Sequence, residues 1–432
     1  MVPSLHHCLV VGAGAAGLMA ARELARAGKK VTVLEARDRC GGRIYPLHEF
    51  GYAAEGGAEF VHGAAPVTRA LTREAGLSLV PIEGARWGAH KGTFSPRESQ
   101  LPHEALLHRA LIELKTDLPI AQFLQTHFAH RQYTEVREVV RRMVEGYDAA
   151  DPDRASTFAL RDELIGQGRG RHGRIAGGYG ALIKFLVSEC RKHGTTIRLL
   201  SVVTAIEENR GRLAARCRGG TIHQADAAIV AVPLPILRDI AFPPALHEKV
   251  AASADIGFGN VVKILLRFAR KWWTDCGEHD LSELSFLFSR ATVPVWWTQH
   301  PCDFPLLTGW FAGPKADTVA RFTVAELVTM GIESLAEIFN LPPDRITRDL
   351  VTSRAINWGS DPFARGAYSY ATLKTREAQA VLRNPNGGAI YFSGEALYDG
   401  RDMGTVEAAL ATGKATAQAI LATSQESPTL CS

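Results

Sequence analysis

Hydrophobic positions near the start of the chain are grouped as a strand, a helix and a second strand. Residues 9–11 form the continuous apolar run that is typical of a buried parallel strand. Residues 15–27 are rich in Ala, Leu and Met and end at Gly28, which predicts a helix with a C-terminal glycine. Residues 31–34 predict the second strand, which ends at Glu35. The beginning of the chain is therefore expected to form a strand–turn–helix–strand unit.

Later parts of the chain show helical and strand patterns in separate blocks. Helical spacing covers most of residues 67–170, whereas strand patterns dominate 196–232 and 261–311. A helix, a strand and a final helix follow. The elements that we expect in these blocks are Arg69–Glu74, Glu104–Leu118, Tyr133–Tyr147, Ala181–His193, Ile197–Leu200, Leu213–Cys217, Ala227–Val232, Val261–Phe268, Trp296–Trp297, Leu306–Phe311, Thr323–Phe339, Ile390–Ser393 and Val406–Ala422.

The order of these elements predicts an α/β fold with two discontinuous domains. The two ends of the chain suit one α/β domain, and the middle supplies a second domain with a mixed sheet and helices. We place the first domain at residues 1–66, 175–250 and 380–432, and the second at 67–174 and 251–379.

Composition and charge narrow the classes of function. The 432 residues carry 49 Lys and Arg against 45 Asp and Glu, without a long basic run, so we expect no nucleic-acid partner. Seven cysteines form no Cys-x-x-Cys pair and the 15 histidines show no zinc pattern, so we expect no metal site. No signal peptide or apolar membrane span is visible, which predicts a cytoplasmic protein without a membrane anchor. A homodimer stays open.

A glycine-rich turn at Gly12, Gly14 and Gly17 follows the first strand and opens the first helix. These glycines permit the tight turn, the approach of a pyrophosphate and close packing of helix on sheet. Free N–H groups at the helix N-terminus, next to Ala15 and Ala16, suit an anion. Glu35 lies 18 residues after Gly17 and suits the ribose hydroxyls of an adenosine. The unit predicts a Rossmann-type dinucleotide site, but it does not separate FAD from NAD.

The stretch Glu35-Ala36-Arg37 with Gly41-Gly42-Arg43 resembles the flavin amine oxidase family, which includes polyamine oxidases and lysine-specific histone demethylases. The resemblance implies FAD as the cofactor. Residues 56–63 resemble the family segment that lies against the flavin ring. Near the C-terminus, Trp358 and residues 361–370, and later residues 393–395 and 404–407, resemble further family motifs. The cofactor-binding residues that we expect are Gly12, Gly14, Ala15, Ala16, Gly17, Glu35, Ala36, Arg37, Gly41, Gly42, Arg43, Gly57, Ala58, Glu59, Phe60, Val203, Trp358, Tyr368, Gly394, Glu395, Gly404, Thr405 and Val406.

The resemblance also implies three catalytic residues. Lys263 matches the lysine that holds a water beside flavin N5, and a flavin-bound water would partner this buried amine. Tyr368 matches an aromatic wall that faces the flavin. His62 matches a histidine that lies by the substrate in animal polyamine oxidases. Ala367 stands where monoamine oxidases carry the cysteine that bonds FAD, so the FAD here is expected to be non-covalent. Thr405 replaces the second tyrosine of monoamine oxidases, so their two-tyrosine cage is absent.

The activity that this resemblance implies is FAD-dependent oxidation of a primary or secondary aliphatic amine, polyamine-like, to an imine and aldehyde. Oxygen would take the electrons and give hydrogen peroxide. Glu145 and Asp148 are candidate ligands for a distal ammonium group, or else solvated charges on a helix. An L-amino acid oxidase also stays open, and its substrate carboxylate would need an arginine such as Arg86, Arg171 or Arg174. A carotenoid-type desaturase has a similar N-terminal motif, but Lys263 and the segment around Tyr368 argue against it. A non-catalytic FAD-binding scaffold stays open as well.

Overall fold

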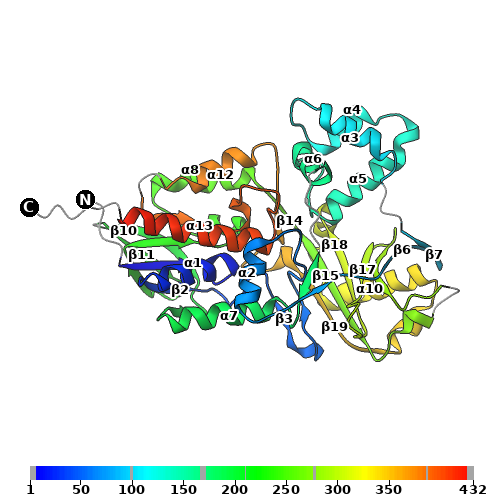
Figure 1. Cartoon of the computed structure of the whole chain (residues 1–432), viewed down its shortest axis with the longest axis horizontal. Coiled ribbons are helices and arrows are strands. Elements are labelled where there is room, and N and C mark those ends of the chain that lie inside the picture. The colour runs from blue at the N-terminus through cyan, green and yellow to red at the C-terminus, as the bar shows by residue number, and fades with distance from the viewer. Residues whose placement is uncertain are drawn as a thin grey trace, which may run out of the picture.

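A five-stranded parallel sheet forms the base of one half of the molecule (Figure 1). The computed structural model describes residues 6–97, 101–165, 172–209, 211–275, 279–385 and 388–425. The sheet runs in the order β21 (Ile390–Phe392), β13 (Ala227–Val230), β1 (His7–Val11), β2 (Lys30–Leu34) and β9 (Thr196–Arg198). It joins strands from both ends of the chain, as the order of the expected elements requires, and its inner strands are almost completely buried.

Three helices cover this parallel sheet. They are α1 (Ala15–Arg26), α7 (Tyr179–Lys192) and α13 (Val406–Gln425). The first and last helices of the chain pack side by side, and α7 also contacts α1 (Figure 1). The helices and strands expected here from the sequence are confirmed within a few residues, since each has a long apolar face against the sheet.

A small antiparallel sheet and three helices complete this half. The sheet consists of β10 (Val203–Asn209), β11 (Arg212–Cys217) and β12 (Ile222–Ala225). It shares a hydrophobic cluster with β1 and β13, and with the helix α12 (Thr375–Arg383), which packs on α8 (His247–Ala252). The helix α2 (Pro66–Glu74) contacts α13.

A seven-stranded mixed sheet forms the other half of the molecule. Its order is β19 (Leu350–Asn357), β15 (Val261–Phe268), β18 (Leu306–Ala312), β17 (Val295–Trp297), β16 (Leu284–Phe288), β6 (Ala85–His90) and β7 (Thr93–Pro96). The helix α10 (Val324–Phe339) packs on it and begins with a capping box at Thr323 and Glu326. The expectation that residues 67–170 are mostly helical was wrong for β6 and β7. These two strands at one end of the sheet bury only Ala89 and Phe94, so they lack an apolar run.

Four helices form a separate lobe above this sheet (Figure 1, cyan to green). They are α3 (Glu104–Glu113), α4 (Ile120–His127), α5 (Thr134–Gly146) and α6 (Thr157–Ile165). The expected helix Glu104–Leu118 was too long, because the proline at 119 disfavours helical backbone at the residue before it and instead caps α4. The lobe has its own hydrophobic cluster around Phe123 and Val140.

The remaining short elements connect these parts. They are β3 (Pro46–Leu47), β4 (Ala54–Glu55), β5 (Leu79–Pro81), β8 (Gly173–Ile175), β14 (Gly257–Gly259), α9 (Pro314–Asp317), α11 (Pro343–Thr347) and β20 (Tyr368–Tyr370). In the described part of the chain, no helix is both long and apolar enough to cross a membrane. The described residues also bring together no group of three or more metal-ligating side chains. The domain boundaries given above stay a prediction.

Candidate functional site

A single cavity of about 2610 Å³ runs from the glycine-rich turn to the mixed sheet and the helical lobe. Most small-molecule pockets measure roughly 300–1,000 Å³, so this cavity has room for a large cofactor together with a second molecule. Gly12, Gly14 and Glu35 lie along its wall at one end, and Lys263 and Tyr368 lie along its wall at the other. Every cofactor-binding residue expected from the sequence lines it except Gly17.

The glycine-rich turn has the geometry that the motif predicts. Gly17 lies where α1 packs on β1, and a Cβ there would approach the Gly12 carbonyl oxygen to 2.0 Å. Gly14 caps α1 and faces the cavity. The Glu35 carboxylate accepts hydrogen bonds from the backbone N–H of Ala13 at 2.7 Å and of Arg37 at 2.9 Å. These bonds fix the carboxylate at the end of β2 and leave lone pairs for ribose hydroxyls.

Two ion pairs hold the next stretch against the C-terminal motifs. The Arg37 guanidinium binds both carboxylate oxygens of Asp361, at 2.8 and 2.6 Å. Arg43 Nη1 donates to Glu395 Oε1 and to the Ala367 carbonyl oxygen, both at 2.7 Å. Arg43 is therefore already paired with a carboxylate, although its sequence position suggests only a role in neutralising pyrophosphate. That role, and the ribityl contact expected of Glu395, stay predictions.

The N-terminus of α13 also faces the cavity. The Thr405 hydroxyl accepts a hydrogen bond from the Ala408 backbone N–H at 3.2 Å and so caps the first turn. Glu407 accepts hydrogen bonds from the backbone N–H groups of Val67 at 2.9 Å and Thr68 at 2.7 Å, which ties α13 to α2. Free N–H groups of this turn, next to Val406, are oriented to stabilise negative charge.

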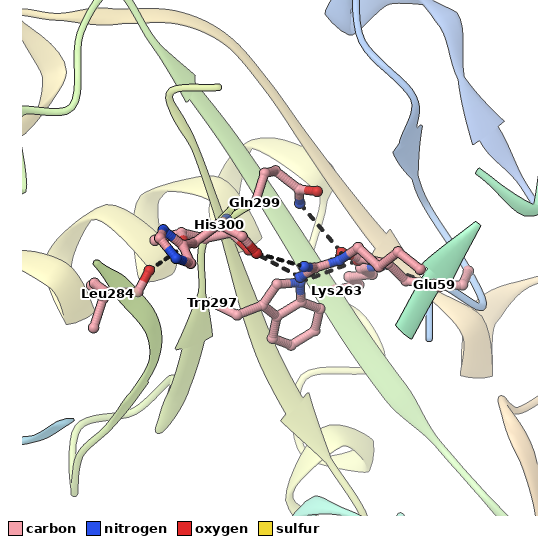
Figure 2. Close-up of polar contacts among 9 residues, drawn as sticks. Glu59, Lys263, Leu284, Trp297, Gln299 and His300 are labelled. Atoms are coloured by element: carbon pink, nitrogen blue, oxygen red, sulfur yellow. Dashed lines mark hydrogen bonds and ion pairs between the residues drawn. The ribbon is translucent and has the colours of Figure 1, made fainter. Parts of the chain in front are cut away.

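Lys263 forms a buried ion pair with Glu59 (Figure 2). Lys263 lies on the strand β15, between β19 and β18, and is 1% exposed. Its Nζ lies 2.8 Å from Glu59 Oε2 and donates to the Gly57 carbonyl oxygen at 3.1 Å. The sequence suggested a water as the partner of this amine, whereas the structure provides a carboxylate. The sequence carries one signal for the pairing of Lys263 with Glu59, because each is a charged residue in an apolar stretch and neither charge is stable when buried alone.

The Glu59 carboxylate also accepts hydrogen bonds from side chains on and next to the mixed sheet and on β8 (Figure 2). The donors are Arg174 Nε at 2.9 Å, Gln299 Nε2 at 3.2 Å and Trp297 Nε1 at 3.0 and 3.1 Å. Burial alone would raise the pKa of Glu59, but the charges of Lys263 and Arg174 outweigh it and lower the pKa to about 2. We call Glu59, Lys263, Arg174, Trp297 and Gln299 the Glu59 hub.

Aromatic rings line the cavity next to the hub. Tyr368 and Trp310 lie nearly parallel, with ring centroids 6.4 Å apart and an interplanar angle of 21°. Trp310 Nε1 donates to the Gly146 carbonyl oxygen at 2.6 Å, and the Tyr368 hydroxyl donates to the Tyr147 carbonyl oxygen at 2.7 Å. Both rings are thus fixed to the end of α5. Sequence reasoning missed Trp310, whose alternation on β18 resembles that of any core residue.

Trp296 and Trp297 are neighbours on β17 and point to opposite faces of this strand. Trp296 is completely buried in the hydrophobic core of the mixed sheet. Trp297 lines the cavity, and its ring centroid lies 5.7 Å from that of Trp310. Trp297, Trp310 and Tyr368 therefore lie together in the cavity wall next to the hub.

His62 lies in a cluster of polar rings at the same end of the cavity. Its Nδ1 is 3.2 Å from Nδ1 of His172 and 3.3 Å from the Tyr147 hydroxyl. Burial, together with His172, lowers the pKa of His62 to about 4. The imidazole is therefore uncharged at neutral pH and offers a hydrogen bond without repelling a cation.

Two carboxyl groups from the helical lobe also line the cavity. Asp148 follows α5, Glu163 lies on α6, and both belong to the cavity wall. Burial and the nearby Glu163 raise the pKa of Asp148 well above its usual range. Glu145, the other acidic candidate, lies 3.5 Å from Lys315 and is already paired. Asp148 is thus no solvated helix-surface charge.

The arginines considered as carboxylate ligands have different positions. Arg174 belongs to the Glu59 hub, and Arg171 lies outside the described residues. Arg86 lines the cavity, where its guanidinium lies over the ring of Phe286 at 5.6 Å. Of the two candidates within the described residues, Arg86 and Arg174, it is Arg86 that lines the cavity in which a substrate carboxylate would lie.

Comparisons with known proteins agree with this geometry. A family model described as flavin containing amine oxidoreductase matches residues 15–421. The probable polyamine oxidase 4 of Arabidopsis thaliana is 29% identical over 90% of this chain and 82% of its own length. The human lysine-specific histone demethylase 2 is 27% identical, over 92% of this chain and 51% of its own. Cyclohexylamine oxidase from Brevibacterium oxydans IH-35A has a TM-score of 0.79 at 20% identity, covering 98% of this chain and 100% of the other. Wild-type putrescine oxidase bound to putrescine has a TM-score of 0.77 at 21% identity, covering 96% of this chain and 99% of the other.

Proposed function

Because the chain belongs to the flavin containing amine oxidoreductase family, we propose that it oxidises an aliphatic amine that carries a second positive charge, as diamines and polyamines do. Polyamine oxidases among its relatives and amine oxidases among similar folds support an aliphatic amine. The observation that carries the proposal is the pair of carboxyl groups, Asp148 and Glu163, in the wall of the cavity that also holds Lys263 and Tyr368.

The cavity residues fit FAD held without a covalent bond. The glycine-rich turn and Glu35 suit the ADP half, while Lys263, Tyr368 and the N-terminus of α13 suit the flavin half. Ala367, which lines the cavity, offers no nucleophile for attachment. When bound, FAD supplies a hydride acceptor whose electrons pass on to oxygen and give hydrogen peroxide. The oxidised amine is an imine, which water hydrolyses to an aldehyde and ammonia or a smaller amine.

The aromatic walls and His62 position the reacting amine. Trp297, Trp310 and Tyr368 give it a flat apolar surface that excludes water, and the polar edges of Trp310 and Tyr368 are already hydrogen-bonded. His62 is uncharged, so it accepts or donates a hydrogen bond without favouring the ammonium form of the substrate. The neutral amine is the form that can lose hydride, and this environment favours it.

The distal ammonium group pairs with Asp148 and Glu163. Burial raises the pKa of Asp148, and the neighbouring Glu163 carboxyl group raises it further because the two groups repel each other when both are ionised. A cation placed beside them removes this repulsion and favours the ionised form. The pair therefore binds a substrate cation and releases a proton in return.

Anaerobic reduction of the bound flavin tests both parts of the proposal. We expect a four-carbon diamine to reduce the flavin efficiently and butylamine, which matches its length, to do so less well. Asp148→Asn should lower kcat/KM for the diamine at least tenfold, about 1.4 kcal/mol, and leave butylamine nearly unchanged. Glu145→Gln is the matched control, because Lys315 already pairs with that carboxylate.

The outcomes separate the possible functions. Equal loss for both amines in Asp148→Asn would contradict the distal site. Reduction by L-amino acids alone would favour an L-amino acid oxidase, with Arg86 as the carboxylate ligand. A flavin that no amine reduces would favour a non-catalytic scaffold, and the same result would keep a carotenoid-type desaturase open.

A further inference from the structure

We propose that Glu59 is a positioning residue that holds the Lys263 ammonium group charged and fixed at the flavin end of the cavity. The inference deepens the proposed function and rests on it for the place of the flavin. Glu59 lies in the segment 56–63, which the sequence suggests only as a surface for the flavin ring. Its side chain reaches past that surface to the mixed sheet (Figure 2).

The position of Glu59 does not depend on Lys263. Arg174 Nε and Gln299 Nε2 donate to Oε1 at 2.9 and 3.2 Å, and Trp297 Nε1 lies between the two oxygens at 3.0 and 3.1 Å. These donors come from β8, from β17 and from the segment after it, so they approach the carboxylate from separate parts of the chain. A carboxylate has about four lone-pair sites, so this set nearly saturates it. Glu59 is therefore rigid before the lysine is considered.

Lys263 has little freedom of its own. Its side chain is 1% exposed on β15, and two of its three N–H donors are used by Glu59 and the Gly57 carbonyl oxygen. Nζ also lies 5.3 Å from the centroid of the Trp297 ring, within range of a cation–π contact. Among the described contacts, the third donor is left to face the cavity that Lys263 lines.

Glu59 forms ion pairs with two cations, Lys263 and Arg174, so its negative charge offsets the repulsion between them. Two further ionisable groups act on this set. Burial raises the pKa of Glu55 to about 7, so Glu55 is only partly ionised at neutral pH. Burial also raises the pKa of Tyr52, which therefore stays uncharged. Without the Glu59 charge, Lys263 would share a dry site with the like charge of Arg174, and loss of its proton would be favoured.

The Glu59→Gln variant tests this role because glutamine keeps the shape of the side chain and removes its charge. We expect an additional ionisation between pH 6 and 10 in the pH dependence of two quantities. One is the midpoint potential of bound FAD, and the other is the rate at which oxygen reoxidises the flavin after photochemical reduction. At the high-pH end, reoxidation should fall about tenfold or more, to the level of Lys263→Met. Neither measurement uses an amine, so they remain valid even if the proposed substrate is wrong.

Three further variants decide the interpretation. Glu59→Gln combined with Lys263→Met should lose the additional ionisation, because the group that titrates is gone. Glu59→Asp should retain the wild-type pH profile, since the charge is preserved. Arg174→Gln should also retain it, because Lys263 keeps its carboxylate. If Glu59→Gln binds FAD too weakly to measure, Glu59→Asp and Arg174→Gln must still match the wild-type profile.

Two results would overturn the proposal. The first is a Glu59→Gln enzyme that binds FAD and has the wild-type pH profile, which would reduce Glu59 to a structural contact. The second is an additional ionisation that persists in the double variant or appears in Glu59→Asp, because the titrating group would then not be Lys263 or would not respond to the Glu59 charge. A lowered melting temperature alone accompanies either role and does not distinguish them.

Discussion

Gly413 lies on α13 where this helix crosses α1, directly behind the first turn that lines the cofactor cavity. A Cβ at Gly413 would lie 2.2 Å from the Ala16 carbonyl oxygen, and real Cβ atoms essentially never approach other atoms closer than 3.0 Å. Gly413→Ala therefore forces the two helices apart by about 0.8 Å. Overpacking of this kind costs about 1–3 kcal/mol. Because Ala15 and Ala16 also line the cavity, the strain falls on the residues that face the cofactor.

We expect Gly413→Ala to weaken FAD binding about 5- to 150-fold, the equivalent of that strain, without changing the amine end of the cavity. Fluorescence titration of the apoprotein with FAD measures the loss. Gly146→Ala serves as the control, since a Cβ there meets no atom within 4 Å and Gly146 lies on α5, away from α1. Unchanged FAD affinity together with a lower melting temperature would refute the reasoning, because the strain would then displace α13 and leave α1 in place.

Three further predictions concern the charged and titratable groups. Lys263→Met should slow reoxidation of the reduced flavin by oxygen while FAD stays bound, and unchanged oxygen kinetics in stopped-flow experiments would remove Lys263 from that role. His62 has its pKa lowered from 6.5 to about 4, so the unfolded chain binds more protons there and stability is lost as pH falls through this window. The urea midpoint of His62→Gln should be less sensitive to pH between 6.5 and 4 than that of the wild type. Glu59 has its pKa lowered from 4.5 to about 2, so its stabilisation is complete above 4.5 and is lost below it. The difference in stability between wild type and Glu59→Gln should therefore shrink by about 1.4 kcal/mol from pH 7 to pH 3.5, and a constant difference would contradict the ion-paired state.

The elements with a strong apolar face could be predicted from the sequence. The expected strand Val261–Phe268 is β15 without a shift at either end, and the expected helix Thr323–Phe339 is α10 with Thr323 as its cap. The strands β6 and β7 at one end of the mixed sheet could not be predicted, because a strand that buries one residue has no periodic pattern. The pairing of β6 with β16 is a tertiary contact made some 200 residues away, and β7 in turn pairs with β6.

The candidate site divides in the same way. The glycine-rich turn and Glu35 are local in sequence, so their motif predicts their geometry. The partner of Lys263 lies 204 residues away, and no local pattern connects the two. The motif around Glu59 suggested a flavin surface, whereas its carboxylate binds Lys263, Arg174 and Trp297. Trp310 and Glu163 were missed for a similar reason: each resembles an ordinary sheet or helix residue until the fold brings it to the cavity.

Glu59 and Asp148, at the two ends of the cavity, have different electrostatic surroundings. Glu59 lies between two cations of the chain itself, which keep its pKa at about 2. Burial raises the pKa of Asp148, and the neighbouring carboxyl group of Glu163 raises it further. The flavin end therefore contains a carboxylate whose charge is already balanced, whereas the lobe end contains one whose ionisation an incoming cation would favour. Under the proposed function, we therefore expect a substrate with two amino groups to bind with one ammonium toward Asp148, which leaves its other amino group for the aromatic walls next to the Glu59 hub.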